Sequence, residues 1–203
     1  MKRGQRPPRI NRIRKPSVRV KASTRFALHE VGAAAVEFTL VAPIYILMLV
    51  GITELSLAMY NRFALNGSVS AAANYAILNA SEAGSTSGAT LAQNLALIVA
   101  NGHASNWANA TITVNNGPVA TLSGGVVTTS GTATNANSCY CPTLSGSAVT
   151  WGSAMTCGAV CSGGGIAGKF VWIVATSQYT SLFGSSGVMP SQMFTTSSVV
   201  ETQ

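Results

Sequence analysis

The sequence has few of the residues that most enzyme and metal sites require. Among its 203 residues it has no Asp, only five Glu, and only His29 and His103. The sequence therefore has too few carboxylate side chains for paired-carboxylate acid–base sites or for acidic cages that bind Mg²⁺ or Ca²⁺. A three-histidine zinc site is impossible, and a Ser-His-acid triad has almost no candidates. We expect no catalytic residues, no cofactor and no metal ion.

Charge is also scarce, and it is unevenly placed. Charged residues make up 8% of the chain, against about 25% in ordinary soluble domains. Residues 1–32 hold ten of the twelve basic residues and carry a net charge of +9, whereas residues 33–203 carry −2. This pattern predicts a basic arm on a nearly neutral body that lies partly in a membrane or is exported into an assembly.

A long apolar run follows the arm. Residues 38–53 contain no charge and as a helix would span roughly 24 Å, less than the ~30 Å hydrocarbon core. Extending the run through Glu54 to Tyr60 gives 23 residues, or roughly 34 Å. We predict one membrane-spanning helix that includes or closely borders Glu54. A buried core helix is the alternative.

The basic arm is explained most simply by membrane topology. Basic residues before the span and only Arg62 just after it place the N-terminus in the cytoplasm and the C-terminal domain outside. An arm that binds nucleic acid or anionic lipid is the other interpretation. Because a membrane helix follows the arm directly, we expect no nucleic-acid partner.

The periodicity beyond the span predicts an α+β fold. One helix is expected from about Ala33 to about Asn79, and a short second helix over 90–102. Short strands are expected at 110–116, 125–129 and 168–183, and the C-terminal MFTTSSVVETQ is compatible with one more. We divide the chain into a basic cytoplasmic leader (1–32), a transmembrane and extended helix (33–80), and a small, β-rich exported domain (81–203).

The four cysteines form two close pairs in the predicted exported domain. Cys139 and Cys141 are separated by one residue, and Cys157 and Cys161 by three. Exported proteins retain disulfides, and a bridge inside the first pair would strain disulfide geometry. We therefore favour bridges between the pairs, which would stabilise the loop between them. A four-cysteine zinc site and free thiols are the alternatives.

The junction between arm and span carries the strongest motif. It reads Val-Gly-Ala-Ala-Ala-Val-Glu-Phe over 31–38. An ordinary signal peptide is cleaved after its apolar segment, and no clear site of that kind follows this one. A Gly just before an apolar run, with a Glu and an aromatic residue five and six positions later, is instead typical of a prepilin-peptidase substrate.

This segment resembles the N-terminal signature of the TadE-like family of pseudopilins in Tad/Flp type IVb pili, which TadG-like proteins share. The matching residues are Gly32, Ala33, Glu37, Phe38, Pro43, Gly51 and Glu54. The resemblance implies a pilin-like architecture and cleavage by a prepilin peptidase between Gly32 and Ala33. It also implies a structural role in pilus assembly and Tad secretion, and hence in cell adhesion.

The implied partners are other pilin-like subunits and the pilus assembly platform, and the implied location is the inner membrane, with the C-terminal domain periplasmic or extracellular.

Glu37 and Glu54 are then intramembrane carboxylates, which are costly unless paired. We expect Glu37 to pair with the new N-terminal amine of its own or a neighbouring subunit; lying at the headgroup level is the alternative. A membrane-anchored, exported ligand-binding protein unrelated to pili is the competing function.

Overall fold

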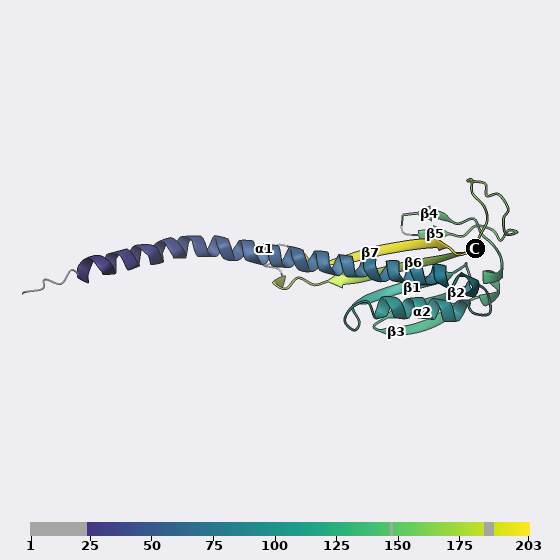
Figure 1. Ribbon diagram of the computed structural model, residues 1–203, viewed down its shortest axis with the longest axis horizontal. Helices are drawn as coiled ribbons and strands as arrows, with labels where there is room; N and C mark the ends of the chain where they lie inside the picture. The colour runs from purple at the N-terminus through teal and green to yellow at the C-terminus, as the bar shows by residue number, and fades with distance from the viewer. Residues whose placement is uncertain (1–23, 147, 185–188) are drawn as a thin grey trace, which may run out of the picture. The chain divides into compact units, whose positions relative to one another are not determined.

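The computed structural model describes residues 24–146, 148–184 and 189–203 (Figure 1). It consists of a long helix α1 (Thr24–Leu78), a shorter helix α2 (Gly88–Ala100) and seven strands in two sheets. The predicted α+β class, with a long apolar N-terminal helix followed by a β-rich domain, is confirmed. Most of the predicted basic leader, residues 1–23, lies outside the described residues.

Helix α1 ends where the sequence predicts but begins earlier. The predicted helix starts near Ala33, whereas α1 starts at Thr24 and therefore continues through Gly32. Residues 24–31 contain no proline and several good helix formers, so no local signal stops the helix there. The chain divides into two compact units between Ile46 and Leu47. The predicted boundaries at residues 32 and 80 remain predictions.

The larger sheet has five antiparallel strands in the order β3-β2-β1-β6-β7. These strands are β1 (Ala108–Val114), β2 (Pro118–Ser123), β3 (Val126–Gly131), β6 (Phe170–Tyr179) and β7 (Gln192–Glu201). Strands were predicted close to β1, β3 and β6, and β7 occupies the C-terminal segment. The sequence did not predict β2, whose Pro and Ala residues have low strand propensity, so its pairing with β1 and β3 decides its conformation.

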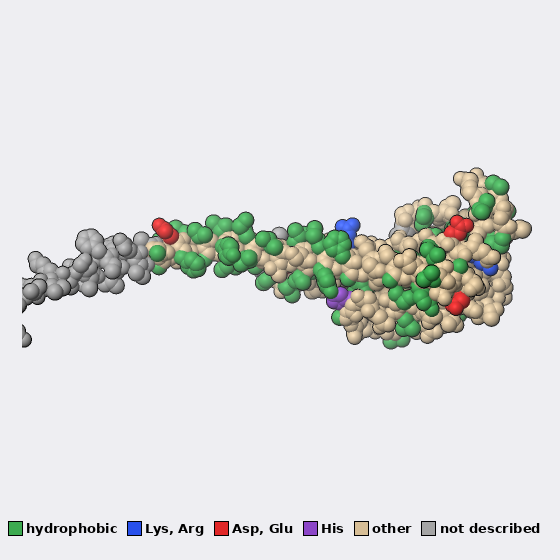
Figure 2. Space-filling model, in the orientation of Figure 1, with side chains coloured by type: hydrophobic (Ala, Val, Ile, Leu, Met, Phe, Trp, Pro, Cys, Tyr) green, Lys and Arg blue, Asp and Glu red, His purple; other side chains and the backbone are tan. Residues whose placement is uncertain are grey.

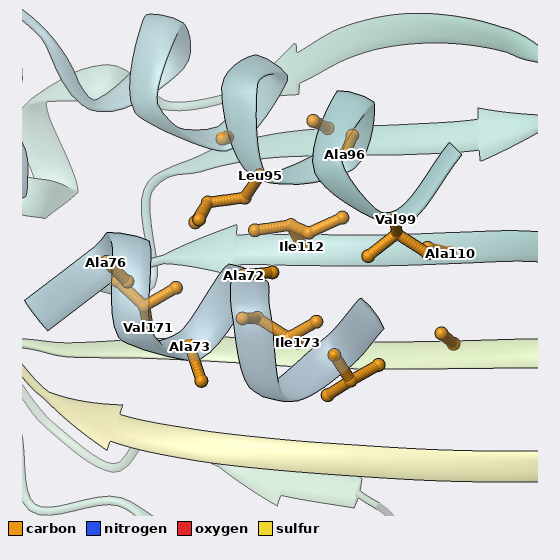
Figure 3. Packing of buried hydrophobic residues seen from close by; sticks show 14 of the residues in the cluster. Ala72, Ala73, Ala76, Leu95, Ala96, Val99, Ala110, Ile112, Val171 and Ile173 are labelled. Carbon is orange, nitrogen blue, oxygen red and sulfur yellow. The ribbon is translucent and has the colours of Figure 1, made fainter. Parts of the chain in front are cut away.

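Both helices contribute to one core on the same face of this sheet (Figure 3). On α2 the buried residues Leu91, Leu95 and Val99 recur at helical spacing. On β6 every second side chain is buried, including Val171 and Ile173. From α1 the core receives mainly small side chains, Ala72, Ala73 and Ala76. Small side chains let the α1 backbone approach the sheet closely.

The segment between β3 and β6 contains little regular structure. It holds the short 3₁₀ helix η2 (Ala133–Asn137) and a two-stranded sheet of β4 (Thr143–Ser145) and β5 (Ala148–Thr150). A second 3₁₀ helix, η1 (Ala80–Glu82), links the two α-helices. Isolated bridges join Cys139 to Met155 and Tyr140 to Gly168. Since little regular sheet holds this segment, isolated backbone hydrogen bonds, side-chain contacts and disulfides position it.

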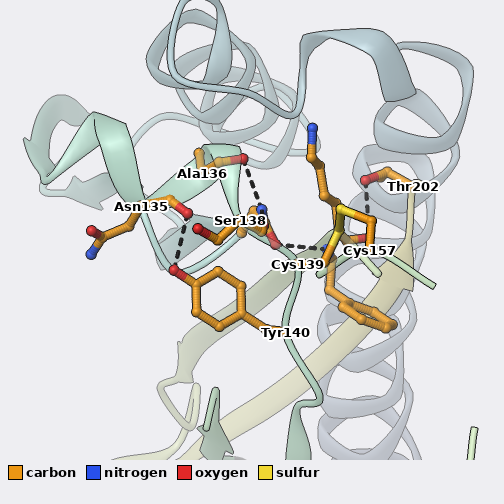
Figure 4. Close-up of a disulfide and its surroundings, with 10 residues drawn as sticks. Asn135, Ala136, Ser138, Cys139, Tyr140, Cys157 and Thr202 are labelled. Carbon is orange, nitrogen blue, oxygen red and sulfur yellow. Dashed lines mark hydrogen bonds between the residues drawn. A yellow bond between two sulfur atoms is a disulfide. The ribbon is translucent and has the colours of Figure 1, made fainter. Parts of the chain in front are cut away.

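One buried side chain fixes the start of this segment. The Asn115 amide Nδ2 donates to the backbone oxygens of Ala136 and Ser138, at 2.8 and 2.6 Å. Its Oδ1 accepts from the backbone N–H of Phe170 at 3.4 Å, and the side chain is fully buried. Figure 4 shows the adjoining residues, where the Tyr140 hydroxyl donates to the Asn135 backbone oxygen at 3.0 Å.

We expect Asn115→Ala to destabilise the domain far more than Asn116→Ala. Both residues have positive φ, 47° and 56°, so both substitutions lose roughly 1 kcal/mol of left-handed preference. Only Asn115→Ala also removes the donor from the buried Ala136 oxygen and the part-buried Ser138 oxygen, which raises its total cost to about 2–4 kcal/mol. Thermal unfolding of the two variants measures the difference. Equal costs would show that the Asn115 amide does not hold the segment.

Candidate assembly helix and its docking site

The environment of α1 changes along its length. From residue 34 to residue 53, no described side chain is buried, and large apolar groups such as Phe38 and Leu47 are 73% and 65% exposed. Figure 2 shows hydrophobic side chains gathered along this part of the helix. From Glu54 onward, one face of α1 is buried. An apolar surface of this extent in contact with water would be unfavourable, so it requires lipid or protein around it.

The exposed apolar segment has the length of a membrane span. Residues 34–53 are twenty positions, or roughly 30 Å of helix, which equals the hydrocarbon thickness of a bilayer. In the described part of the chain, α1 is the one helix long and apolar enough to cross a membrane. The exposed stretch before Glu54, the first buried residue of α1, is thus long enough to cross a bilayer. The predicted extension of the span through Glu54 to Tyr60 remains a prediction.

The buried face of α1 begins at Glu54 and follows helical spacing. The buried positions are Glu54, Ala58, Leu65, Ser68, Val69, Ala72, Ala73 and Ala76. Their separations of mainly three and four residues place them on one stripe. The opposite side includes exposed residues such as Phe63 and Ile77. The second half of α1 therefore packs one face on the β-rich domain, while its other face also carries exposed apolar side chains.

The carboxylate of Glu54 lies inside a polar site at the start of this stripe. Its side chain is 0% exposed. The hydroxyl of Ser181 donates a hydrogen bond to Oε1, and the backbone N–H of Met189 donates to Oε2 at 3.0 Å. The hydroxyl of Tyr179 donates to the Glu54 backbone oxygen at 3.2 Å. These contacts join α1 to both ends of the connection between β6 and β7.

The electrostatic effect of Glu54 appears at Tyr179. Burial raises the pKa of the Tyr179 hydroxyl, and the negative charge of Glu54 raises it further. The folded state therefore favours the neutral phenol, which is the form that donates to α1. This contribution to stability is complete below pH ~10, where free tyrosine ionises, and it is lost as the pH rises through the folded pKa.

The other predicted site residues on α1 lie in its first part. Gly32 and Ala33 are inside the helix, and Gly32, Glu37 and Phe38 are exposed. The prediction that Glu37 and Glu54 are intramembrane carboxylates remains a prediction. For Glu54, the structure adds protein hydrogen-bond donors that the sequence did not reveal. Ser181 and Met189 lie more than 120 positions from it in the sequence, and no local motif marks them.

The four cysteines form the two inter-pair disulfides that the spacing favoured. Cys139 bonds to Cys157, and Cys141 bonds to Cys161. Figure 4 shows the first bridge beside Thr202 and Tyr140. Cys139 is fully buried, whereas Cys141 is half-buried. Since all four sulfur atoms are in S–S bonds, the thiolates that a zinc site would require are not present in this state.

These features define a class of protein: an α+β protein in which one described helix is long and apolar enough to cross a membrane and continues into the folded domain. Within that class, residues 32–74 match the model of the family described as TadE-like protein. The match begins at Gly32 and includes Glu37 and Glu54, so the predicted resemblance is confirmed over this segment. No curated protein and no solved structure matches the chain.

The family match covers part of the chain. It covers α1 from Gly32 to Asn74 and leaves the β-rich domain unmatched. At the level of the family, it supports association with a membrane and with the pilin-like components of Tad pili. The structure itself shows the disulfides and a helix that is long and apolar enough to cross a membrane.

Proposed function

We propose that the chain is a TadE-like minor pilin or pseudopilin that acts as a structural component in Tad/Flp pilus assembly and thereby supports surface adhesion. The observation that carries the proposal is the TadE-like match on a helix whose apolar segment, residues 34–53, has no buried position in its own domain. The proposed role requires no catalytic residue, and we propose that the chain is not an enzyme.

The exposed segment suits two successive environments. In the inner membrane its apolar side chains face lipid, with the basic leader in the cytoplasm and the β-rich domain on the periplasmic or extracellular side. In a pilus or its initiation complex, the same side chains would pack against the helices of other pilin-like subunits. Helix packing in lipid depends on close van der Waals contact, which the small residues Ala34 and Ala35 permit.

Processing at Gly32 would prepare this helix for assembly. Cleavage between Gly32 and Ala33 by a prepilin peptidase leaves a free amine four residues from Glu37. A carboxylate within a membrane or a helix bundle is costly unless it is paired, so an amine–Glu37 pair would select the register between subunits. Since the bond lies inside α1, the helix must unwind locally for cleavage. Glycine weakens a helix by about 1 kcal/mol relative to alanine and so favours that opening.

A Gly32→Ala variant tests this function, with Gly51→Ala as its matched control. Alanine strengthens the helix at residue 32 and removes the residue that the peptidase would recognise, so we expect the leader to remain attached. Gly51 lies in the same helix beyond the cleavage site, and its variant should be processed normally. N-terminal sequencing and intact mass of the membrane-extracted proteins should show Ala33 as the first residue in the control alone.

Filament counts on cells that carry each variant in place of the natural chain complete the test. We expect pili to be lost in the deletion strain and with Gly32→Ala, and to be retained with Gly51→Ala. Normal processing of Gly32→Ala would contradict the peptidase step. Normal pili in the deletion strain would contradict the assembly role itself and leave the membrane-anchored ligand-binding alternative.

A further inference from the structure

The connection between β6 and β7 presents apolar side chains on its surface. Leu182 is 63% exposed and Phe183 is 45% exposed. They directly follow Ser181, whose hydroxyl bonds the Glu54 carboxylate. Exposure of two adjacent large apolar side chains to water on a loop is unfavourable unless an apolar surface covers them.

The position of these residues indicates what covers them. Ser181 and Met189 both bond to Glu54, the first buried residue after the exposed apolar segment of α1. Met189 also lines an apolar groove on α1 together with Met48, Gly51, Ile52 and Leu55. All of these residues belong to the compact unit that begins at Leu47. At Met189 the connection therefore lies against the last two turns of the segment that has the length of a membrane span.

The charge pattern suits a lipid surface. Between Lys169 and Glu201 the sequence contains no charged residue and no histidine. A loop without charges can enter the boundary between headgroups and acyl chains without desolvating an ion. It also offers nothing for electrostatic attraction to anionic lipids, so the contact should not depend on lipid charge or salt.

We propose that Leu182 and Phe183 insert into the bilayer surface from which α1 emerges at Glu54, so that the β-rich domain has a second membrane contact beside its helix. The Glu54 hydrogen bonds hold Ser181 and Met189, on either side of the connection, at the required height on α1. This inference depends on membrane anchoring by α1 and not on the proposed pilus function. It predicts a domain held close to the membrane surface before any assembly.

Depth-dependent fluorescence quenching of a Leu182→Trp variant tests the proposal. The full-length variant is reconstituted into uncharged phosphatidylcholine vesicles whose acyl chains are brominated near the headgroup or near the bilayer centre. The signal is the difference from the unsubstituted chain, because Trp107, Trp151 and Trp172 give a background. We expect stronger quenching by the shallow bromines, as for a side chain about 5–10 Å deep, and protection from aqueous iodide.

Leu144→Trp is the matched control. Leu144 is also 63% exposed, but it lines a cavity with Phe170 and Glu201. These two residues pair at the end of the β6–β7 ladder opposite to Tyr179, nine residues and roughly 30 Å along β6. Its tryptophan should be quenched by iodide and not by bromolipid.

Three results would overturn the proposal. One is lipid quenching of Leu182→Trp no greater than that of Leu144→Trp, and another is full access of iodide to residue 182. The third is protection from iodide without quenching by bromolipid, which would mean that protein covers the residue. A Phe183→Trp variant repeats the measurement if Leu182→Trp does not retain both disulfides and the circular dichroism of the natural chain.

Discussion

Replacing Glu54 by alanine is expected to free the β6–β7 connection from α1 and to destabilise the domain by about 2–3 kcal/mol. The substitution leaves the Ser181 hydroxyl and the Met189 N–H without their carboxylate acceptor. Hydrogen bonds to charged groups contribute about 1.5–3 kcal/mol each. Relief of the desolvation cost of the buried carboxylate offsets part of that loss, so the net effect is smaller than the sum.

Thermal unfolding and hydrogen exchange of the full-length chain in detergent measure this effect. We expect the Met189 amide to exchange at least about tenfold faster in Glu54→Ala, since 1.4 kcal/mol corresponds to a factor of ten. Glu54→Gln keeps the shape and one acceptor oxygen, so its loss of stability should be intermediate.

Thr53→Ala is the control. Its hydroxyl is exposed and bonds only within α1, to the Leu49 oxygen. Equal stability of Glu54→Ala and Thr53→Ala would show that the carboxylate does not secure the connection.

Most of the helices and strands could be predicted because their signals are local. The uncharged run at 38–53 and the Ala- and Leu-rich residues after it predict a helix that ends near Asn79, and α1 ends at Leu78. The alternating β-branched and aromatic residues after Lys169 predict β6. By contrast, β2 and the β4–β5 pair have weak local signals. Their conformation depends on cross-strand partners that a single sequence does not identify.

The role of Glu54 in the fold could not be predicted for the same reason. A carboxylate at the end of an apolar run is compatible with the membrane interior, a subunit contact or the headgroup level. What distinguishes it here is the proximity of Ser181 and Met189, which are 127 and 135 positions away. Only the folding of β6 and β7 onto α1 brings them to Glu54. For the cysteines, the geometry that disfavours a bridge within Cys139–Cys141 predicted bridges between the two pairs. It did not predict which of the two possible inter-pair connectivities forms, and the structure has Cys139–Cys157 and Cys141–Cys161.

Removing both disulfides should destabilise the domain more than the two single removals added together. The bridged residues are 18 and 20 positions apart, and the two loops overlap almost completely. In the chain-entropy model, the first bridge to close such a loop stabilises by about 3 kcal/mol, and the second then closes only a short ring and adds about 2 kcal/mol. Either pair replaced by alanine should therefore cost about 2 kcal/mol, and both pairs about 5 kcal/mol.

A loss of about 5 kcal/mol is comparable to the whole stability of many small domains, so the chain without all four cysteines should fail to fold or fold only marginally. Urea unfolding of the Cys139→Ala/Cys157→Ala, Cys141→Ala/Cys161→Ala and quadruple variants gives the three free energies. Cys139 is fully buried, so its pair also loses core packing and should be the more costly single removal. Strictly additive costs would mean that the bridges act independently. In that case packing by the segment from η2 to β6, rather than the overlapping loops, would determine how it is held.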